Sequence, residues 1–72
     1  MVKAVVLVRA EPEVSIAELK KIPGVKDAFQ VTGRFDLAVL IEVEDLSKIR
    51  EVVFNIHGLR GVRRTETLIH IE

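Results

Sequence analysis

The chain contains no cysteine, no tryptophan and no tyrosine, and its 72 residues carry no net charge. Without cysteine, neither a disulfide framework nor a thiolate metal site can form. Eleven basic residues balance eleven acidic ones, which disfavours direct nucleic-acid binding, because such domains usually carry a basic excess. No apolar run approaches the ~20 residues of a membrane span, and no secretory leader follows Met1. We therefore expect a cytoplasmic protein that contacts neither nucleic acid nor membrane.

A chain of this length forms a hydrophobic core that supplies only about 3–5 kcal/mol of stability. Nearly half of the residues, 49%, are hydrophobic, which is too many for a disordered chain. Because no disulfide is available to add stability, we expect one small domain, spanning residues 1–72, that oligomerises.

The hydrophobic pattern predicts six elements in the order β-α-β-β-α-β. Strands are expected over residues 2–8, 25–32, 35–43 and 62–71, and helices over residues 16–22 and 46–57. Ser15 and Asp45 are good N-caps for the two helices, and Glu18 completes a capping box with Ser15. The pair Gly33-Arg34 predicts a two-residue turn that joins the second and third strands into a hairpin.

One short segment is repeated along the chain: Ile22-Pro23-Gly24-Val25 closes the first helix, and Leu59-Arg60-Gly61-Val62 closes the second. Two βαβ halves joined by a hairpin form a ferredoxin-like plait of the α+β class. Right-handed crossovers place both helices on the same face of the four-stranded antiparallel sheet. The other face of the sheet is then open.

The open face of the predicted sheet is also apolar. Strand 35–43 directs Phe35, Leu37, Val39, Ile41 and Val43 toward the helices, yet Ala38 and Leu40 fall on its other side. The first strand is apolar on both sides. We expect this face to pack against a second copy in a homodimer; the alternative is that neighbouring long side chains cover it.

The residue types that usually act in catalysis have structural explanations here. Ser15 and Ser47 belong to the starts of helices, whereas His57 and His70 lie near the ends of elements. No pair of residues stands at the spacing of a metal site. We therefore assign no catalytic residue, no metal site and no cofactor.

A local basic cluster, Arg60, Arg63 and Arg64, has two interpretations. It could hold a phosphate or carboxylate, or it could form a solvated strand edge that resists edge pairing. Glu66 in the same strand would partly neutralise it.

Two polar segments are more informative. Thr32-Gly33-Arg34-Phe35-Asp36 places a hydroxyl and a carboxylate around a tight turn, and Thr65-Glu66-Thr67 places two hydroxyls on one side of a strand. A free amino acid needs acceptors for its ammonium, which Asp36 offers, and donors for its carboxylate, which Thr32 and exposed backbone N–H groups offer. Turn formation and strand propensity alone would also explain these residues.

In their joint order, these segments resemble the C-terminal effector-binding domain of Lrp/AsnC transcription regulators, also called the RAM (regulation of amino acid metabolism) domain. The resemblance rests on Pro23-Gly24-Val25, on 32–36, on Gly61-Val62 and on 65–67, and it covers nearly the whole chain. In the family a helix-turn-helix domain precedes this one. Because the first strand begins at Val2, we expect a stand-alone RAM domain without a DNA-binding half.

The resemblance implies a function and a site. Family members dimerise through their sheet faces, assemble further into octamers (tetramers of dimers), and bind amino-acid effectors between dimers. The matching positions here are Thr32, Gly33 and Asp36, with Thr65 and Thr67 opposite; the family often has Tyr where this chain has Phe35. We expect a non-enzymatic, amino-acid-responsive oligomer that could co-assemble with full-length regulators.

Two alternatives share the same order of elements. One is an ACT-like allosteric module, although the loop Ala10-Glu11-Pro12-Glu13 lacks the glycine that such modules usually carry. The other is a small dimeric ferredoxin-like enzyme, which would need a polar catalytic group inside the plait. The residues of the third strand expected to face the helices are all apolar, which argues against it.

Overall fold

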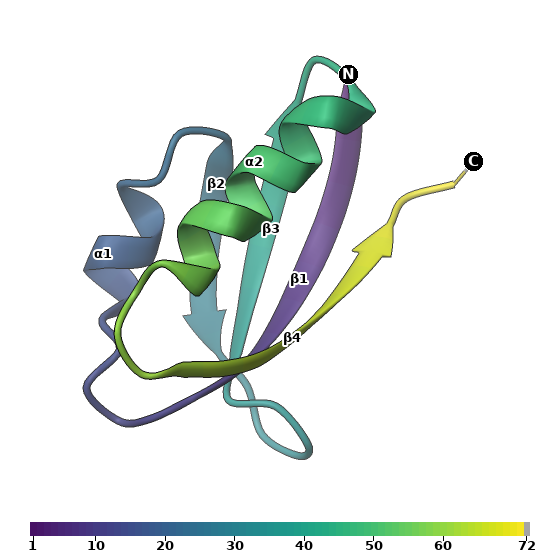
Figure 1. Ribbon diagram of the computed structural model, residues 1–72. Coiled ribbons are helices and arrows are strands. Elements are labelled where there is room, and N and C mark those ends of the chain that lie inside the picture. Colours follow the sequence, from purple (N-terminus) through teal and green to yellow (C-terminus); the bar gives the residue numbers. More distant parts are fainter. Residues whose placement is uncertain (72) are drawn as a thin grey trace.

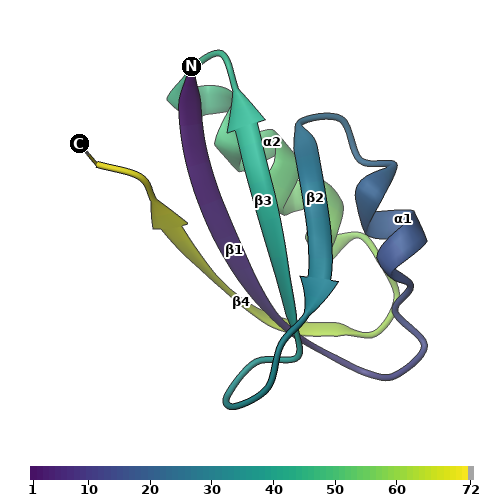
Figure 2. The same cartoon turned by 180° about the vertical axis from the view of Figure 1, so that it is seen from behind.

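The computed structural model describes residues 1–71 and has the predicted order of elements (Figure 1). Its strands are β1 (Val2–Ala10), β2 (Val25–Gln30), β3 (Leu37–Val43) and β4 (Val62–Ile69), and its helices are α1 (Ile16–Lys20) and α2 (Leu46–His57). The strands form one antiparallel sheet in the order β2-β3-β1-β4. Both helices cover one face, and Figure 2 shows the other face without them. The ferredoxin-like prediction is confirmed.

The hydrophobic core lies between the sheet and the helices. Alternate residues of the two central strands point into it, as period-two side-chain geometry requires: Ala4, Val6 and Val8 from β1, and Leu37, Val39, Ile41 and Val43 from β3. Helix α2 adds Ile49, Val52 and Ile56, which lie on one helical face. Each large aliphatic side chain buried in this way stabilises the fold by about 1.5–3 kcal/mol.

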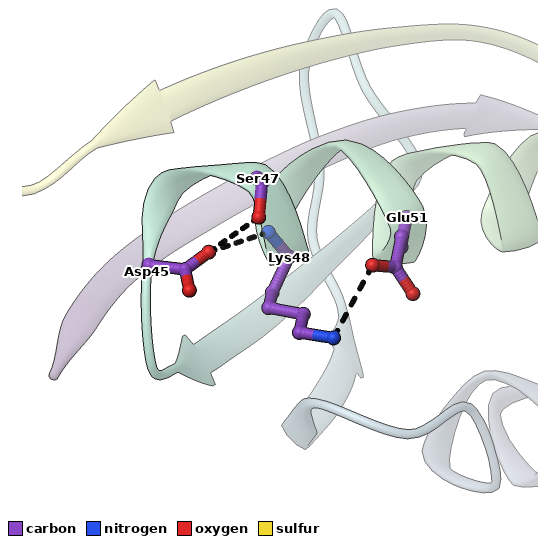
Figure 3. A network of polar contacts seen from close by, with 4 residues as sticks. All are labelled: Asp45, Ser47, Lys48 and Glu51. Carbon is purple, nitrogen blue, oxygen red and sulfur yellow. Dashed lines mark hydrogen bonds and ion pairs between the residues drawn. The ribbon is translucent and has the colours of Figure 1, made fainter.

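Helix α2 begins at the predicted cap. The carboxylate of Asp45 accepts hydrogen bonds from the Ser47 hydroxyl and the Lys48 backbone N–H, and Lys48 forms an ion pair with Glu51 at 3.5 Å (Figure 3). Hydrogen bonding from Ser47 is the main cause that holds the pKa of Asp45 below its ordinary value. These contacts satisfy the first turn of the helix.

Helix α1 is shorter than predicted. Ser15 caps it as expected, because its Oγ accepts the backbone N–H groups of Ala17 and Glu18 at 3.1 and 3.4 Å. Regular helix ends at Lys20, two residues before Ile22. The residue before a proline disfavours the helical conformation, so the chain leaves the helix in advance of Pro23.

The two repeated segments form the same turn. The Val25 N–H donates to the Ile22 carbonyl at 3.1 Å, and the Val62 N–H donates to the Leu59 carbonyl at 3.4 Å. The third residue of each turn is a glycine, and its φ is +95° at Gly24 and +99° at Gly61. A type II turn requires a positive φ at this position. A Cβ at Gly24 would lie 2.7 Å from Val52 Cγ2, so the core leaves no room for a side chain.

The β2–β3 connection is longer than the predicted two-residue turn. The strands pair in the register that such a turn would give, with Gln30 opposite Leu37, but they end at these residues, and residues 31–36 form a loop. Phe35, predicted on the helix-facing side, is outside the core. Phe35 belongs to the loop between the two strands, so strand alternation does not determine where its side chain lies.

The open face of the sheet carries an apolar patch, made of the residues that alternate with the core positions: Val5, Leu7, Phe29, Ala38, Leu40 and Leu68. Phe29 and Leu68 are 42% and 48% exposed. The apolar character predicted for this face is therefore present. Within the part of the chain described, neither helix is long and apolar enough to span a bilayer.

Candidate functional site

A hollow of about 500 Å³ lies beside the hairpin loop. One wall comes from the end of β2, the loop and the start of β3, and the other comes from the segment between β1 and α1. The lining residues are Gln30, Val31, Thr32, Asp36 and Leu37 on one side, and Ala10, Glu11, Pro12 and Val14 on the other. We call this cavity the loop hollow. It contains two of the predicted site residues, Thr32 and Asp36.

Asp36 is held in place by three hydrogen bonds. Its Oδ2 accepts the Ala10 N–H at 2.9 Å, its backbone N–H donates to the Val8 carbonyl at 2.9 Å, and its own carbonyl accepts the Val31 N–H at 3.0 Å. A carboxylate offers about four acceptor positions. The bond to Ala10 therefore orients the carboxylate and still leaves it capacity to accept a ligand.

The opposite wall of the loop hollow is also braced. The Glu11 N–H donates to the Gly61 carbonyl at 2.8 Å, and the Glu11 carboxylate forms a charged hydrogen bond with Arg63. This pairing removes Arg63 from the basic cluster expected from the sequence. Glu11 was not predicted to belong to the site, because its position beside Asp36 arises only from the pairing of β1 with β3.

Thr32 and Gly33 occupy different positions in the loop. Thr32 is exposed and lines the hollow. Gly33 has a φ of +108°, and nothing within 4 Å would meet a Cβ built on it. Gly33 does not line the hollow, so its contribution there is the left-handed conformation that shapes the loop.

Thr65 and Thr67 lie away from the loop hollow in the same chain. They pair with Val8 and Val6 on the helix-covered side of the sheet, and both are half-buried. The Thr65 hydroxyl is 2.8 Å from His57 Nε2, a contact that the sequence did not indicate. One chain thus brings together Thr32 and Asp36 but not the two threonines of β4.

The described residues supply no grouping suited to metal chemistry. Among residues 1–71, no cluster of three or more His, Asp or Glu side chains is close enough to hold an ion. Ser15 and Ser47 have the capping positions predicted for them. The chemistry that the loop hollow offers is hydrogen bonding and charge complementarity.

Comparison with known proteins places this geometry in a family. A model of the Lrp/AsnC ligand binding domain matches residues 3–72. The HTH-type transcriptional regulator LysM of Saccharolobus solfataricus is 28% identical over 72 residues, and a homocitrate synthase of Sulfurisphaera tokodaii is 30% identical over 70 residues. These alignments cover 94% and 92% of this chain, respectively, but only 51% and 15% of the two relatives. The chain therefore spans about half the length of the regulator and a small part of the enzyme.

Solved structures agree with this result. TTHA0845 from Thermus thermophilus is 34% identical, with a TM-score of 0.84, and the match covers 100% of this chain and 95% of that one. The feast or famine regulatory protein Rv3291c of M. tuberculosis, solved with L-methionine, shares the fold with a TM-score of 0.82 at 21% identity. That match covers 100% of this chain and 51% of the regulator. The chain belongs to the Lrp/AsnC ligand-binding domain family.

Proposed function

We propose that this effector-binding domain is non-catalytic and that it binds a free amino acid at the loop hollow. The observation that carries the proposal is the Asp36 carboxylate, which is oriented by Ala10 at the wall of a cavity of about 500 Å³. A rigidly held acceptor of this kind suits an ammonium group, because charge-assisted hydrogen bonds are about twice as strong as neutral ones.

The rest of the hollow complements the other groups of an amino acid. Thr32, which lines the hollow, supplies a hydroxyl that can donate to a carboxylate. The L-methionine bound to Rv3291c, a protein of the same fold, supports this choice of ligand class. If Thr65 and Thr67 also contact the ligand, they do so from a second copy, because in the same chain they lie away from the hollow.

Assembly is part of the proposal. The apolar patch on the open face pairs with that of a second copy to form a homodimer, and four dimers form an octamer. Phe29 and Leu68, 42% and 48% exposed, support the interface, since burying the exposed half of each side chain gains about 1 kcal/mol. The match to half of the regulator LysM further supports co-assembly with full-length regulators.

A thermal-shift panel of free amino acids tests the ligand. A specific amino acid at about 100 times its dissociation constant stabilises the folded state by about 2.7 kcal/mol. Asp36→Asn keeps an oxygen for the Ala10 N–H but removes the charge, so the shift should fall sharply while the unliganded midpoint changes little. Asp36→Ala should lose both the shift and part of the stability.

The matched control is Asp27→Asn. Asp27 caps the Ala28 N–H and pairs with Lys20 at 3.5 Å, away from the loop hollow. This variant should respond to the amino acid as the unmodified protein does. The proposal fails if no amino acid shifts the transition, or if Asp36→Asn retains the full response.

A further inference from the structure

A second hollow, of about 330 Å³, has a lining that the proposed amino-acid site does not use. It is formed by Arg9, Arg34, Phe35, Arg64 and Glu66. Arg9 comes from the end of β1, Arg64 and Glu66 come from the start of β4, and the other two residues belong to the hairpin loop. We call this cavity the arginine hollow. In Figure 2 these segments meet where the loop projects beyond the sheet.

The strand register forces two of the arginines together. Arg9 and Arg64 are direct partners across the antiparallel β1–β4 pair, immediately before the irregularity at Ala10. Like charges directly opposite each other in a sheet are destabilising. The third arginine joins them because the Arg9 guanidinium donates to the Arg34 carbonyl, which ties the loop to the end of β1. The fold thus gathers three cations at one cavity, and one of them, Arg9, also holds the loop there.

Four of the eleven Lys and Arg side chains form ion pairs among residues 1–71, one of them the Lys48–Glu51 pair of α2. Lys20, Lys26 and Arg63 form ion pairs with Asp27, Glu42 and Glu11. Within residues 1–71, the three arginines of the hollow belong to the larger group of cations with no carboxylate within 4 Å, and they are the ones that the fold brings to one cavity. Glu66 is the one acidic residue in the lining, so positive charge dominates the hollow in a chain whose net charge is zero.

We propose that the arginine hollow binds the phosphate groups of a small phosphorylated molecule. Planar guanidinium groups match phosphate oxygens in bidentate fashion, and a bound phosphate would offset the repulsion between Arg9 and Arg64. The cations converge on one cavity instead of following a groove, which fits a small ligand better than a nucleic-acid backbone. Phe35 adds an apolar wall beside the charged groups.

The direct test is titration with pyrophosphate at constant ionic strength, followed by calorimetry and by the thermal midpoint. The unmodified protein should bind saturably, and Arg34→Gln and Arg64→Gln should each weaken binding at least about tenfold, the effect of losing a charged contact to phosphate. Arg64→Gln should also raise the midpoint without pyrophosphate, because it removes the repulsion with Arg9. Arg50→Gln, at an exposed position of α2, is the matched control and should bind normally.

Several results would overturn the proposal. The first is either the absence of saturable pyrophosphate binding or equal weakening of that binding by Arg50→Gln. The second is binding of citrate as tight as that of pyrophosphate, which would show that the hollow selects charge and not phosphate. The third is a change of oligomeric state on Arg34→Gln with unchanged pyrophosphate affinity, which would assign the arginines to contact with another copy.

Discussion

The two faces of the sheet are built from the same strands but differ in how their side chains are used. On the helix-covered face, Val6, Val8 and Val39 are fully buried among aliphatic neighbours. On the open face, residues of the same strands alternate with them, and Phe29 and Leu68 remain exposed. Arg9, Arg64 and Glu66 gather at the hairpin end of this open face.

The two faces of the sheet therefore have different roles: one stabilises the monomer and the other is available for contact with other molecules. The helix-covered face holds the monomer together, since its residues contact both helices and exclude water. The open face is apolar in its middle and charged at one end, an arrangement typical of a surface that meets other molecules. Substitutions at neighbouring positions of one strand should therefore affect monomer stability and association separately.

The largest contrast should come from two adjacent residues of β3. Ile41, 2% exposed, lies on the helix-covered face, and Leu40 lies on the open face. Ile41→Ala should lower the free energy of unfolding by about 2–5 kcal/mol, whereas Leu40→Ala should lower that of the isolated chain by about 1 kcal/mol or less. Urea denaturation at several protein concentrations measures both.

The dependence on protein concentration distinguishes the two faces further. Because a dimer is stabilised by mass action, the effect of Leu40→Ala should grow with protein concentration, and light scattering should show smaller particles. The effect of Ile41→Ala on the free energy should be present at every concentration. Equal, concentration-independent losses at both positions would contradict the division between the faces.

A smaller contrast is expected between two glycines with positive φ. Alanine at either position is strained by about 1–2 kcal/mol. At Gly24 the added Cβ would also meet Val52 and Val43 at 2.7 and 2.9 Å, whereas Gly33 has open space around it. Overpacking adds about 1–3 kcal/mol, so Gly24→Ala should have the lower thermal midpoint. Similar midpoints for the two variants would show that the core can shift to accept the methyl group.

The smallest expected effect on stability comes from Asp45, the N-cap of α2, which is one of the two helices on the covered face of the sheet. The lowered pKa of Asp45 means that its charged form stabilises the folded state at pH values above about 3.9, its unfolded pKa. This stabilisation is lost as the pH falls through the lower, folded pKa. Asn is also a good N-cap, so the gap in thermal midpoint between the protein and Asp45→Asn should narrow from about pH 7 to about pH 3. Glu44→Gln is the neighbouring control, and a gap that widens in acid would contradict the assignment.

Local signals in the sequence predicted most of the fold. Ser15 and Asp45 marked the starts of the helices, and the paired segments around Gly24 and Gly61 marked the two returns to the sheet. These features depend on a few adjacent residues, so local chemistry determines them. The predicted two-residue turn of the hairpin was wrong because that part of the chain depends on a distant contact. The Asp36 backbone N–H donates to the Val8 carbonyl, which is far away in the sequence, and no adjacent residue indicates that contact.

The candidate sites were less predictable because they depend on strand register. Thr32 and Asp36 were predicted to lie together and do line one hollow, but the contribution of Thr65 and Thr67 to ligand binding stays a prediction. Arg64 was grouped with Arg60 and Arg63 by sequence proximity. In the structure its partner is Arg9, a neighbour that only the β1–β4 pairing identifies.

Asp36 has a further consequence for any ligand of the hairpin loop. With its N–H, its carbonyl and its carboxylate bonded to Val8, Val31 and Ala10, this one residue fixes the loop against β1. A ligand that met a loosely held loop would lose affinity to the ordering of that loop, since fixing the backbone of one residue costs about 1–2 kcal/mol. Here folding has already ordered the backbone, so more of the contact energy is available for distinguishing one ligand from another.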